Sequence, residues 1–436
     1  MKNYRALVPI ALVVLMILSW YMLTSEAIKT ESTYNNYLTQ ARKYAEDGIT
    51  KYAIENYNQA LEIKDEPDVY VEVANYYKSQ EKKDDYLAWC EDFFESYPTE
   101  PKAYDCILDA YLTQKDYESC YDVLIIAEKR NISTDIIKKI SDEIKYVFKL
   151  DFSSFDDVGV YSNNFCAVQS KGSWGFVDRY GEQRIACRYT EVGAYTKSNF
   201  ASVNIDGDAY YIDKDGSKVL VSKDKYNSFG LLVDNIIAAE KTDGKYTYVN
   251  NEFKVLFGDY DYASTMNNGI AAVKNGKHWQ LINNEGKATS DAKFVDIKLD
   301  EKQIAYRNNC AFVATNSGKY IMVDSNGKKV GKLEFEDAKI FASESPAAVK
   351  IDGKWCFIDS KGSLISDKKY NDARSYVNGL AAVCIDGKWG FVDEKENIVI
   401  EPQFFNAKDF NEKGSCFVQT GDKWQLLKLY RLNRKD

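Results

Sequence analysis

The chain has 436 residues, of which 45% are hydrophobic and 28% charged, so it can form two or three folded domains and is not disordered throughout. Its formal net charge of -9 argues against nucleic-acid binding, because phosphate recognition needs clustered cations. His278 is the only histidine, which excludes zinc sites built from several histidines, and the nine cysteines contain no CxxC pair. We therefore expect the cysteines to be small buried hydrophobic residues.

The N-terminal region contains an uncharged apolar segment at residues 6–23, ALVPIALVVLMILSWYML. Its length is close to the roughly 20 residues with which a helix crosses about 30 Å of hydrocarbon. No A-x-A-like cleavage site follows it, as a secretory signal peptide requires. The earliest cysteine is Cys90, so no cysteine follows the segment directly to carry a lipid. The sequence therefore predicts an uncleaved transmembrane signal anchor at residues 6–23 rather than a cleaved peptide.

Charged residues on either side of this segment predict its orientation. Lys2 and Arg5 precede it, and Glu26 follows it. Positive charge marks the cytoplasmic side of a membrane helix, so we expect residues 1–5 in the cytoplasm. Residues 24–30 are then a linker to extracytoplasmic domains. The predicted localisation is single-pass in the cytoplasmic membrane, with the N-terminus inside.

Residues 31–150 show helical periodicity that repeats about every 34 residues, a period typical of stacked helix pairs. Small and aromatic residues occupy the same offsets in three copies: Ala41, Tyr44, Ala53, Tyr57 and Ala60; Ala74, Tyr77, Tyr86, Cys90 and Phe93; and Leu108, Tyr111, Cys120, Leu124 and Ala127. The pattern resembles the tetratricopeptide repeat (TPR), although that family's early Trp and its Gly after the following Leu are missing. The resemblance implies an all-α TPR-like solenoid, and we expect residues 132–150 to form one more amphipathic helix that caps it.

Residues 152–436 contain about eight copies of a second unit. A position held mostly by Trp recurs at intervals of 33 to 41 residues, at Trp174, Ala209, Tyr246, Trp279, Tyr320, Trp355, Trp389 and Trp424. A glycine lies two or three residues before each of them, at Gly172, Gly207, Gly244, Gly276, Gly318, Gly353, Gly387 and Gly421. Where Asp or Asn precedes this glycine, the pair predicts a hairpin turn with positive φ. Each unit is thus a small antiparallel sheet that must stack on its neighbours.

Two all-β architectures bury such sheets. A closed, propeller-like ring removes exposed sheet edges, whereas an open β-solenoid leaves edges that need caps. We expect the propeller-like ring, because the units are many and no distinct cap is visible in the sequence. The open β-solenoid remains the alternative.

The segments GKWGFVD at residues 387–393 and GKWCFID at residues 353–359 resemble the WG-containing repeat, also called the KWG repeat. The resemblance is weaker at residues 201–260, where Ala209 replaces the Trp and Tyr210 replaces the Gly. Proteins with this repeat occur on bacterial surfaces and carry no agreed catalytic motif. The resemblance therefore implies a binding or structural role.

Aspartates recur four residues after the Trp position, at Asp178, Asp213, Asp324, Asp359 and Asp393. Asp followed three residues later by Gly is typical of a turn in which the carboxylate accepts backbone N–H groups. We therefore predict no catalytic, cofactor-binding or metal-ligating residues and no enzyme activity. Glycoside hydrolysis needs only a pair of carboxylates, so an extracytoplasmic carbohydrate-active enzyme is the alternative.

Together these patterns predict a membrane-anchored extracytoplasmic scaffold or binding protein that acts through its repeat surfaces. Its expected ligand is a protein, a peptide or a cell-wall polymer. Residues 6–23 attach it to the membrane, and neither a nucleic acid nor a cofactor is expected. The sequence leaves the ligand, the pathway and the oligomeric state open.

Overall fold

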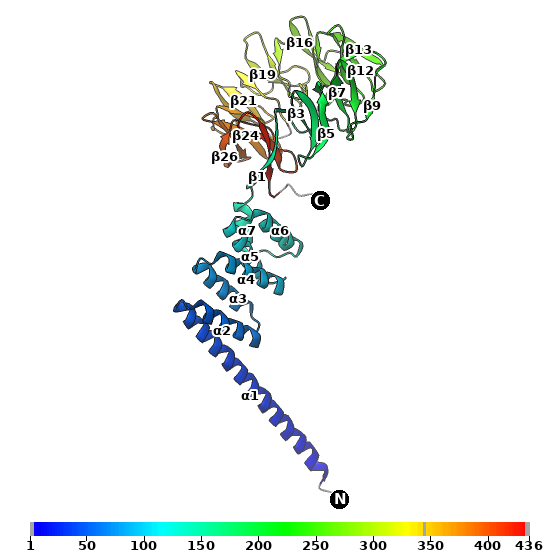
Figure 1. Cartoon of the computed structure of the whole chain (residues 1–436). Helices are drawn as coiled ribbons and strands as arrows, with labels where there is room; N and C mark the ends of the chain where they lie inside the picture. Colours follow the sequence, from blue (N-terminus) through cyan, green and yellow to red (C-terminus); the bar gives the residue numbers. More distant parts are fainter. Residues whose placement is uncertain (1–3, 343–345, 432–436) are drawn as a thin grey trace. The chain divides into compact units, whose positions relative to one another are not determined.

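The computed structural model describes residues 4–342 and 346–431, and the chain divides into two compact units, residues 1–145 and 146–436 (Figure 1). The first unit is all-α and the second is all-β. Each unit is described separately below. Side chains are described from Met16 onward, with the exception of residues 17, 21 and 23.

From residue 4 onward, the helical unit contains seven helices. They are α1 (Tyr4–Glu46), α2 (Thr50–Ile63), α3 (Pro67–Ser79), α4 (Lys83–Ser96), α5 (Pro101–Gln114), α6 (Tyr117–Lys129) and α7 (Asp135–Glu143). Pro67 and Pro101 open α3 and α5 at the first helical position, where the missing N–H of proline costs nothing. The carboxylate of Asp116 and the hydroxyl of Thr134 accept backbone N–H bonds at the starts of α6 and α7. Short connections between these helices make antiparallel helix pairs.

The residues that recur in the three helical copies form the core of this unit. Eleven of them are buried, and Tyr44, Tyr77, Tyr111 and Leu124 are half-buried. The phenol of Tyr57, for example, is buried and donates a hydrogen bond to Glu72 at 2.7 Å. The helical periodicity in the sequence thus identified the packing positions of the helix pairs.

Two expectations for the ends of the helical region need correction. The helix expected over residues 132–150 ends at Glu143, because Phe148–Leu150 pair with a distant strand of the second unit instead. The expected linker at residues 24–30 is not a separate segment, since α1 continues through it with no Gly or Pro to interrupt the helix.

The segment proposed as a membrane anchor falls within α1. Most side chains of residues 6–23 lie outside the described part of the structure. Among the residues that are described, no helix combines the length and the apolar character that a membrane crossing needs.

The second unit consists of eight antiparallel sheets, or blades. The first three are β2 (Asp157–Val158), β3 (Phe165–Ser170), β4 (Ser173–Asp178) and β5 (Gln183–Tyr189); β6 (Glu191–Val192), β7 (Ala201–Ile205), β8 (Asp208–Ile212) and β9 (Lys218–Leu220); and β10 (Tyr226–Phe229), β11 (Ile237–Lys241), β12 (Tyr246–Val249) and β13 (Val255–Tyr260). The next three are β14 (Tyr262–Ala263), β15 (Ile270–Asn275) and β16 (His278–Asn283); β17 (Asp296–Ile297), β18 (Ala311–Ala314) and β19 (Tyr320–Val323); and β20 (Asp337–Ala338), β21 (Ala347–Ile351) and β22 (Lys354–Ile358). The seventh is β23 (Asp372–Ala373), β24 (Leu380–Ile385), β25 (Lys388–Asp393) and β26 (Ile398–Phe404), and the eighth is β27 (Asn406–Ala407), β28 (Ser415–Gln419), β29 (Trp424–Leu429) and β1 (Phe148–Phe155).

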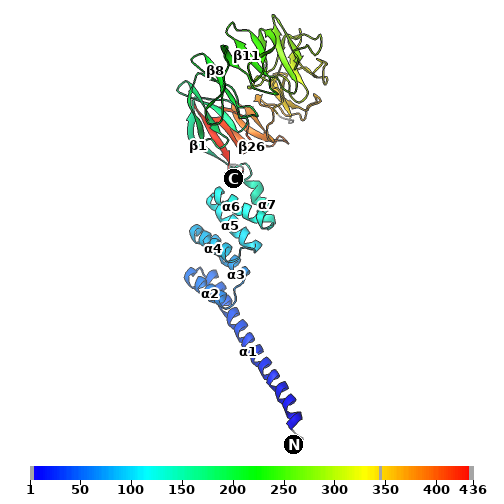
Figure 2. The ribbon, with the colours of Figure 1, turned by 90° about the vertical axis from the view of Figure 1, so that its right-hand side faces the viewer.

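The blades follow one another in a circle, in the order of the sequence colours (Figures 1 and 2). The eighth blade is completed by β1, the first strand of the unit, which pairs antiparallel with β29, the last. The amide of Asn411 in this blade also donates to the carbonyl of Arg179 in the first. The unit is therefore a closed eight-bladed propeller, and the open solenoid alternative is excluded.

The Trp-Gly pair has a steric role in the first and seventh blades. Gly390 follows Trp389 in β25, and a Cβ atom added to it would lie 2.4 Å from the carbonyl oxygen of Ile400 in the outer strand. A Cβ atom added to Gly175, the equivalent residue in β4, would lie at the same distance from the carbonyl oxygen of Ile185 in β5. Glycine at this position lets the long outer strands β5 and β26 pair closely, across a bulge in the register.

Candidate functional site

The central channel of the propeller is the site at which most blades meet. The first strand of each blade lies at one edge of its sheet, and residues that follow these strands in several blades line a common cavity. An aromatic residue either is the first residue of each of these strands or lies just before it. Four positions after that aromatic stand Gly159, Gly193, Gly230, Ser264, Lys298, Lys339, Arg374 and Lys408. One half of the channel wall therefore carries small residues, and the other half carries four cations.

The cations of the wall are held by carboxylates of neighbouring segments. Lys298 pairs with Asp337 and Lys339 pairs with Asp372, each at 2.7 Å. In both pairs the aspartate belongs to the next blade. Burial lowers the pKa of Lys339, although Asp372 acts in the opposite direction. These pairs link blades at the centre of the ring, where water is partly excluded.

The aromatic position of the WG repeat contributes to the same wall. The ammonium of Lys339 lies 4.5 Å from the ring centre of Trp355, and that of Lys298 lies 4.2 Å from the ring centre of Tyr320. Such contacts are cation–π interactions. Trp279, Trp355, Trp389 and Trp424 are all buried, which agrees with the packing role expected for them.

The fifth blade carries an insertion that enters the channel. Thirteen positions separate Lys298 from Ala311, whereas seven separate the equivalent Ser264 from Ala271 in the fourth blade. We call residues 299–304 within this insertion the channel loop. The hydroxyl of Thr265 donates to the carbonyl of Lys302 at 3.0 Å, and the backbone N–H of Thr265 donates to the carbonyl of Gln303 at 2.7 Å. The channel loop is thus fixed to the fourth blade.

The channel loop has the same internal geometry as the outer turns of the blades. One carboxylate oxygen of Asp300 accepts the backbone N–H groups of Lys302 and Ile304 at 2.8 and 2.9 Å. Gln303 has a φ of 59°, in the left-handed region that glycine occupies in the Asp-x-x-Gly turns. The other oxygen of Asp300 accepts a bond from Arg307 at 2.8 Å. These bonds make the channel loop a defined structure rather than a loose connection.

Glu301, at the tip of the channel loop, reaches the opposite wall. Its carboxylate accepts bonds from Arg374 at 2.8 Å and Lys408 at 2.9 Å, in the seventh and eighth blades. Burial acts to raise the pKa of Glu301, but the charges of Arg374 and Lys408 outweigh it and hold this pKa below its ordinary value. The channel loop therefore crosses the channel and is tied to both sides of it.

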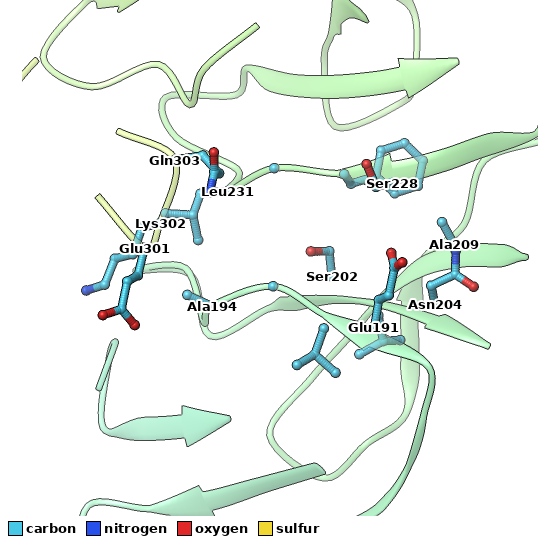
Figure 3. Close-up of a pocket in the computed structure, with 15 residues that line it drawn as sticks. Glu191, Ala194, Ser202, Asn204, Ala209, Ser228, Leu231, Glu301, Lys302 and Gln303 are labelled. Carbon is cyan, nitrogen blue, oxygen red and sulfur yellow. The ribbon is translucent and has the colours of Figure 1, made fainter. Parts of the chain in front are cut away.

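Glu301 lines three cavities beside the channel loop. The largest, about 430 Å³, lies among residues that follow the inner strands of the first, fifth, sixth, seventh and eighth blades; we call it the mouth cavity. Two cavities of about 220 and 350 Å³ lie beside Gly193, on the wall that carries small residues. Figure 3 shows the 220 Å³ cavity, with Glu301, Lys302 and Gln303 on one side and Glu191 and Asn204 on the other.

The recurring aspartates of the repeats behave as predicted. In Asp178, Asp213, Asp324, Asp359 and Asp393, one carboxylate oxygen accepts the backbone N–H groups two and four residues later. They are turn residues. His278 is exposed at the start of β16. Among residues 4–342 and 346–431, no group of three or more His, Cys, Asp or Glu side chains is placed to hold a metal ion.

The nine cysteines are all free thiols. Seven are buried, and Cys106 and Cys187 are half-buried. Burial raises the pKa of Cys310 to about 12, so this thiol stays protonated and unreactive at neutral pH. The expectation that the cysteines serve as small buried hydrophobic residues agrees with these positions.

Sequence reasoning missed the channel wall and the channel loop. Both left a signal: Lys or Arg stands four residues after the leading aromatic in four consecutive units, and the longest interval between Trp positions, from Trp279 to Tyr320, contains the insertion. The length of this interval alone did not show that the additional residues enter the central channel.

Comparisons with solved structures give similarities at low sequence identity. BamB from Moraxella catarrhalis is 12% identical, with a TM-score of 0.42, and the match covers 65% of this chain and 100% of that one. The WD40 β-propeller domain of Doa1 is 13% identical, with a TM-score of 0.31 over 64% of this chain and 95% of that one. The TPR domain of Sgt2 from Aspergillus fumigatus is 18% identical, with a TM-score of 0.22 over 26% of this chain and 76% of that one. No curated protein sequence matches the chain.

The family comparison agrees with the repeat pattern of the second unit. The model of the WG-containing repeat matches residues 174–207, 246–279, 322–355, 357–389 and 389–424. All five matches fall within the propeller, and each begins or ends at or next to an aromatic position of the repeat. Five segments of the eight-bladed propeller therefore match the WG-containing repeat.

Proposed function

We propose that the chain is a membrane-anchored extracytoplasmic scaffold that binds a protein partner through its repeat surfaces and catalyses no reaction. The observation that carries this proposal is an open groove in the helical unit. The small and aromatic residues that recur at 34-residue spacing support a TPR-like assignment of this unit. Stacked helix pairs of this kind offer extended surfaces to ligands.

The groove has a volume of about 870 Å³ and lies over α2, α3 and α4. It is lined by Asn58, Leu61, Glu62, Asp65, Tyr70, Trp89, Asp92, Glu95 and Ser96. The ring centres of Tyr70 and Trp89 lie 5.4 Å apart, and the Trp89 indole donates to the carbonyl of Tyr70 at 2.9 Å. The aromatic pair is therefore fixed in place before any ligand binds.

The charge of this groove indicates the chemistry of the partner. Four carboxylates line it, and no cation does. Asp92 and Glu95 are exposed on α4, so both can form ion pairs with a ligand. An extended segment that carries Lys or Arg would meet these carboxylates and could place a cation over Trp89 or Tyr70. We infer that the partner presents such a basic segment.

The membrane attachment and the topology of this proposal rest on the sequence. Residues 6–23 are uncharged, and Lys2 and Arg5 precede them. We propose that this segment anchors the chain in the cytoplasmic membrane and that both repeat units lie outside the cytoplasm. The partner is then a component of the cell envelope.

Crosslinking of the full-length chain in intact cells, followed by purification, tests this function. We expect a protein partner to be captured, and we expect Asp92→Asn together with Glu95→Gln to reduce its recovery severalfold. Asp142→Asn together with Glu143→Gln is the matched control, because this pair removes two exposed carboxylates of α7 outside the groove. Equal recovery with both double variants would contradict a role for the groove. Turnover of a glycan by the purified chain would contradict the non-catalytic assignment.

A further inference from the structure

Lys302 is a cation of the mouth cavity that forms no direct ion pair within the described chain. Arg307 pairs with Asp300, and Arg374 pairs with Asp409 and Glu301. The charges of Arg307 and Arg374 are therefore balanced by carboxylates of the protein. The ammonium of Lys302 makes no hydrogen bond or ion pair with residues 4–342 or 346–431, and Asp300 and Asp409 act on it only through charge at longer range. Arg179 and Lys413 also line the cavity and already interact within the protein. Lys302 is therefore a cation of this cavity that a ligand can pair with without displacing a direct partner.

The surroundings of Lys302 make an unpaired charge unfavourable. Burial and the nearby guanidinium of Arg307 lower the pKa of Lys302 and outweigh the charges of Asp300 and Asp409, which act in the opposite direction. The folded protein therefore disfavours the positive charge of Lys302. An anion that enters the cavity would favour the protonated, positively charged form of Lys302. An anionic ligand would thus meet a group whose charge the protein compensates only in part.

The backbone presents Lys302 at a fixed position. Its N–H donates to Asp300 and its carbonyl accepts from Thr265, so the main chain of this residue is held on both sides. The insertion in the fifth blade that brings it into the channel is the longest interval of the repeat array. A ligand therefore does not need to order the main chain of Lys302, which favours binding.

We propose that the mouth cavity binds a small polar molecule with one anionic group, which pairs with the ammonium of Lys302. The volume of about 430 Å³ is within the range of small-molecule sites, roughly 300–1,000 Å³. Side chains of Ser162, Asn163 and Asn378 line the same cavity. Each donates a hydrogen bond to a backbone carbonyl, so its oxygen atom is the group suited to accept a bond from a hydroxyl or amide N–H of the ligand. An ammonium is a point charge without the planar fork of arginine, so a carboxylate and a phosphate are both suitable anions.

Titration calorimetry on the full-length chain in detergent tests this proposal. The probes are glucuronate, glucose 6-phosphate and glucose, which share a sugar ring and differ in the anionic group. We expect one or both anions to bind and glucose not to bind. Lys302→Met should weaken binding of the anion by about tenfold or more, because a charged hydrogen bond contributes roughly 1.5–3 kcal/mol. Lys302→Arg keeps the charge and should retain most of the affinity.

Two controls separate a binding role from a structural one. Lys214→Met removes an exposed cation on the turn between β8 and β9 and should leave binding unchanged. The melting temperature of the Lys302→Met variant should be equal to or higher than that of the native chain, because the ammonium has no direct partner to lose and the fold disfavours its charge. Absence of heat with both anions at millimolar concentration would overturn the proposal. Equal binding of glucose, or unchanged affinity in the Lys302→Met variant, would also overturn it.

This inference does not depend on the groove of the helical unit. Lys302→Met should leave capture of the protein partner unchanged, and Asp92→Asn with Glu95→Gln should leave the calorimetric titration unchanged. Failure of one proposal is therefore distinguishable from failure of the other.

Discussion

The substitution Gly390→Ala tests the steric role of the Trp-Gly pair. The added Cβ would lie 2.4 Å from the carbonyl oxygen of Ile400 and 2.7 Å from the nitrogen of Pro402. Both contacts are with backbone atoms, which cannot turn aside as a flexible side chain does. Strands β25 and β26 must therefore separate, and the pairing of Trp389 with Phe404 and of Phe391 with Ile400 is strained or lost.

We expect this change to lower the free energy of unfolding of the propeller by about 1–3 kcal/mol, the usual cost of overpacking, and by more if β26 detaches. Gly159→Ala is the matched control. Its φ is not in the left-handed region, and the added Cβ would make an ordinary contact at 3.5 Å with the side chain of Ala167. That variant should be neutral or slightly more stable, because alanine restricts the unfolded chain.

Urea unfolding followed by tryptophan fluorescence measures both variants against the native chain. The slope of free energy against urea concentration shows whether the transitions are comparable. If Gly390→Ala and Gly159→Ala unfold at the same urea concentration as the native chain, the close approach of β25 and β26 is not what requires glycine in this repeat.

Three further predictions concern the channel, the turns and the anchor. Glu301→Gln should cost about 1–2 kcal/mol near neutral pH, discounted for the third of this side chain that water reaches. Because the folded-state pKa of Glu301 is lowered, its contribution to stability is present above the ordinary glutamate pKa and is lost as the pH falls through the lowered value. The urea midpoints of the native chain and the variant should therefore converge in acid. A difference between the midpoints that stays constant with pH would refute the charge assignment. Asp359→Ala should cost about 1–2 kcal/mol, since two backbone N–H groups lose their acceptor, whereas Asp359→Asn should be nearly neutral, as Asn250 and Asn283 already fill this role in other blades. Equal loss in both variants, measured by thermal unfolding, would argue against the turn role. Deletion of residues 6–23 should move the chain from the membrane fraction to the soluble fraction of lysed cells, and retention in the membrane fraction would contradict the proposed anchor.

Much of the fold was predictable because both units repeat. A Trp position and a Gly position that recur in phase define a hairpin in every unit, and eight such sheets require stacking. The recurring aspartates were also predictable, because a turn needs only local residues. Asp359, for example, bonds to N–H groups two and four positions later in its own turn.

The positions that sequence reasoning missed depend on contacts between distant residues. Phe148–Leu150 were expected in a helix, but they pair with β29, almost the full length of the propeller away in sequence. The partner of Glu301 in the seventh blade, Arg374, is equally hard to identify, because only the closed ring brings the two blades together. A local pattern can show that residues 299–304 are additional, but not that they cross the channel.

Closure of the ring is the claim on which the channel and its loop depend, and a disulfide between β1 and β29 tests it most directly. Ser154 and Gln425 are opposite each other in the pairing of these strands. Directly paired residues of antiparallel strands have Cα atoms about 4.5–5.5 Å apart, which suits a disulfide. With Ser154→Cys and Gln425→Cys, mild oxidation should give an intrachain crosslink, seen as faster migration on a non-reducing gel. In an open array these two residues lie at opposite ends, and a chain that forms no such crosslink would contradict the closed propeller.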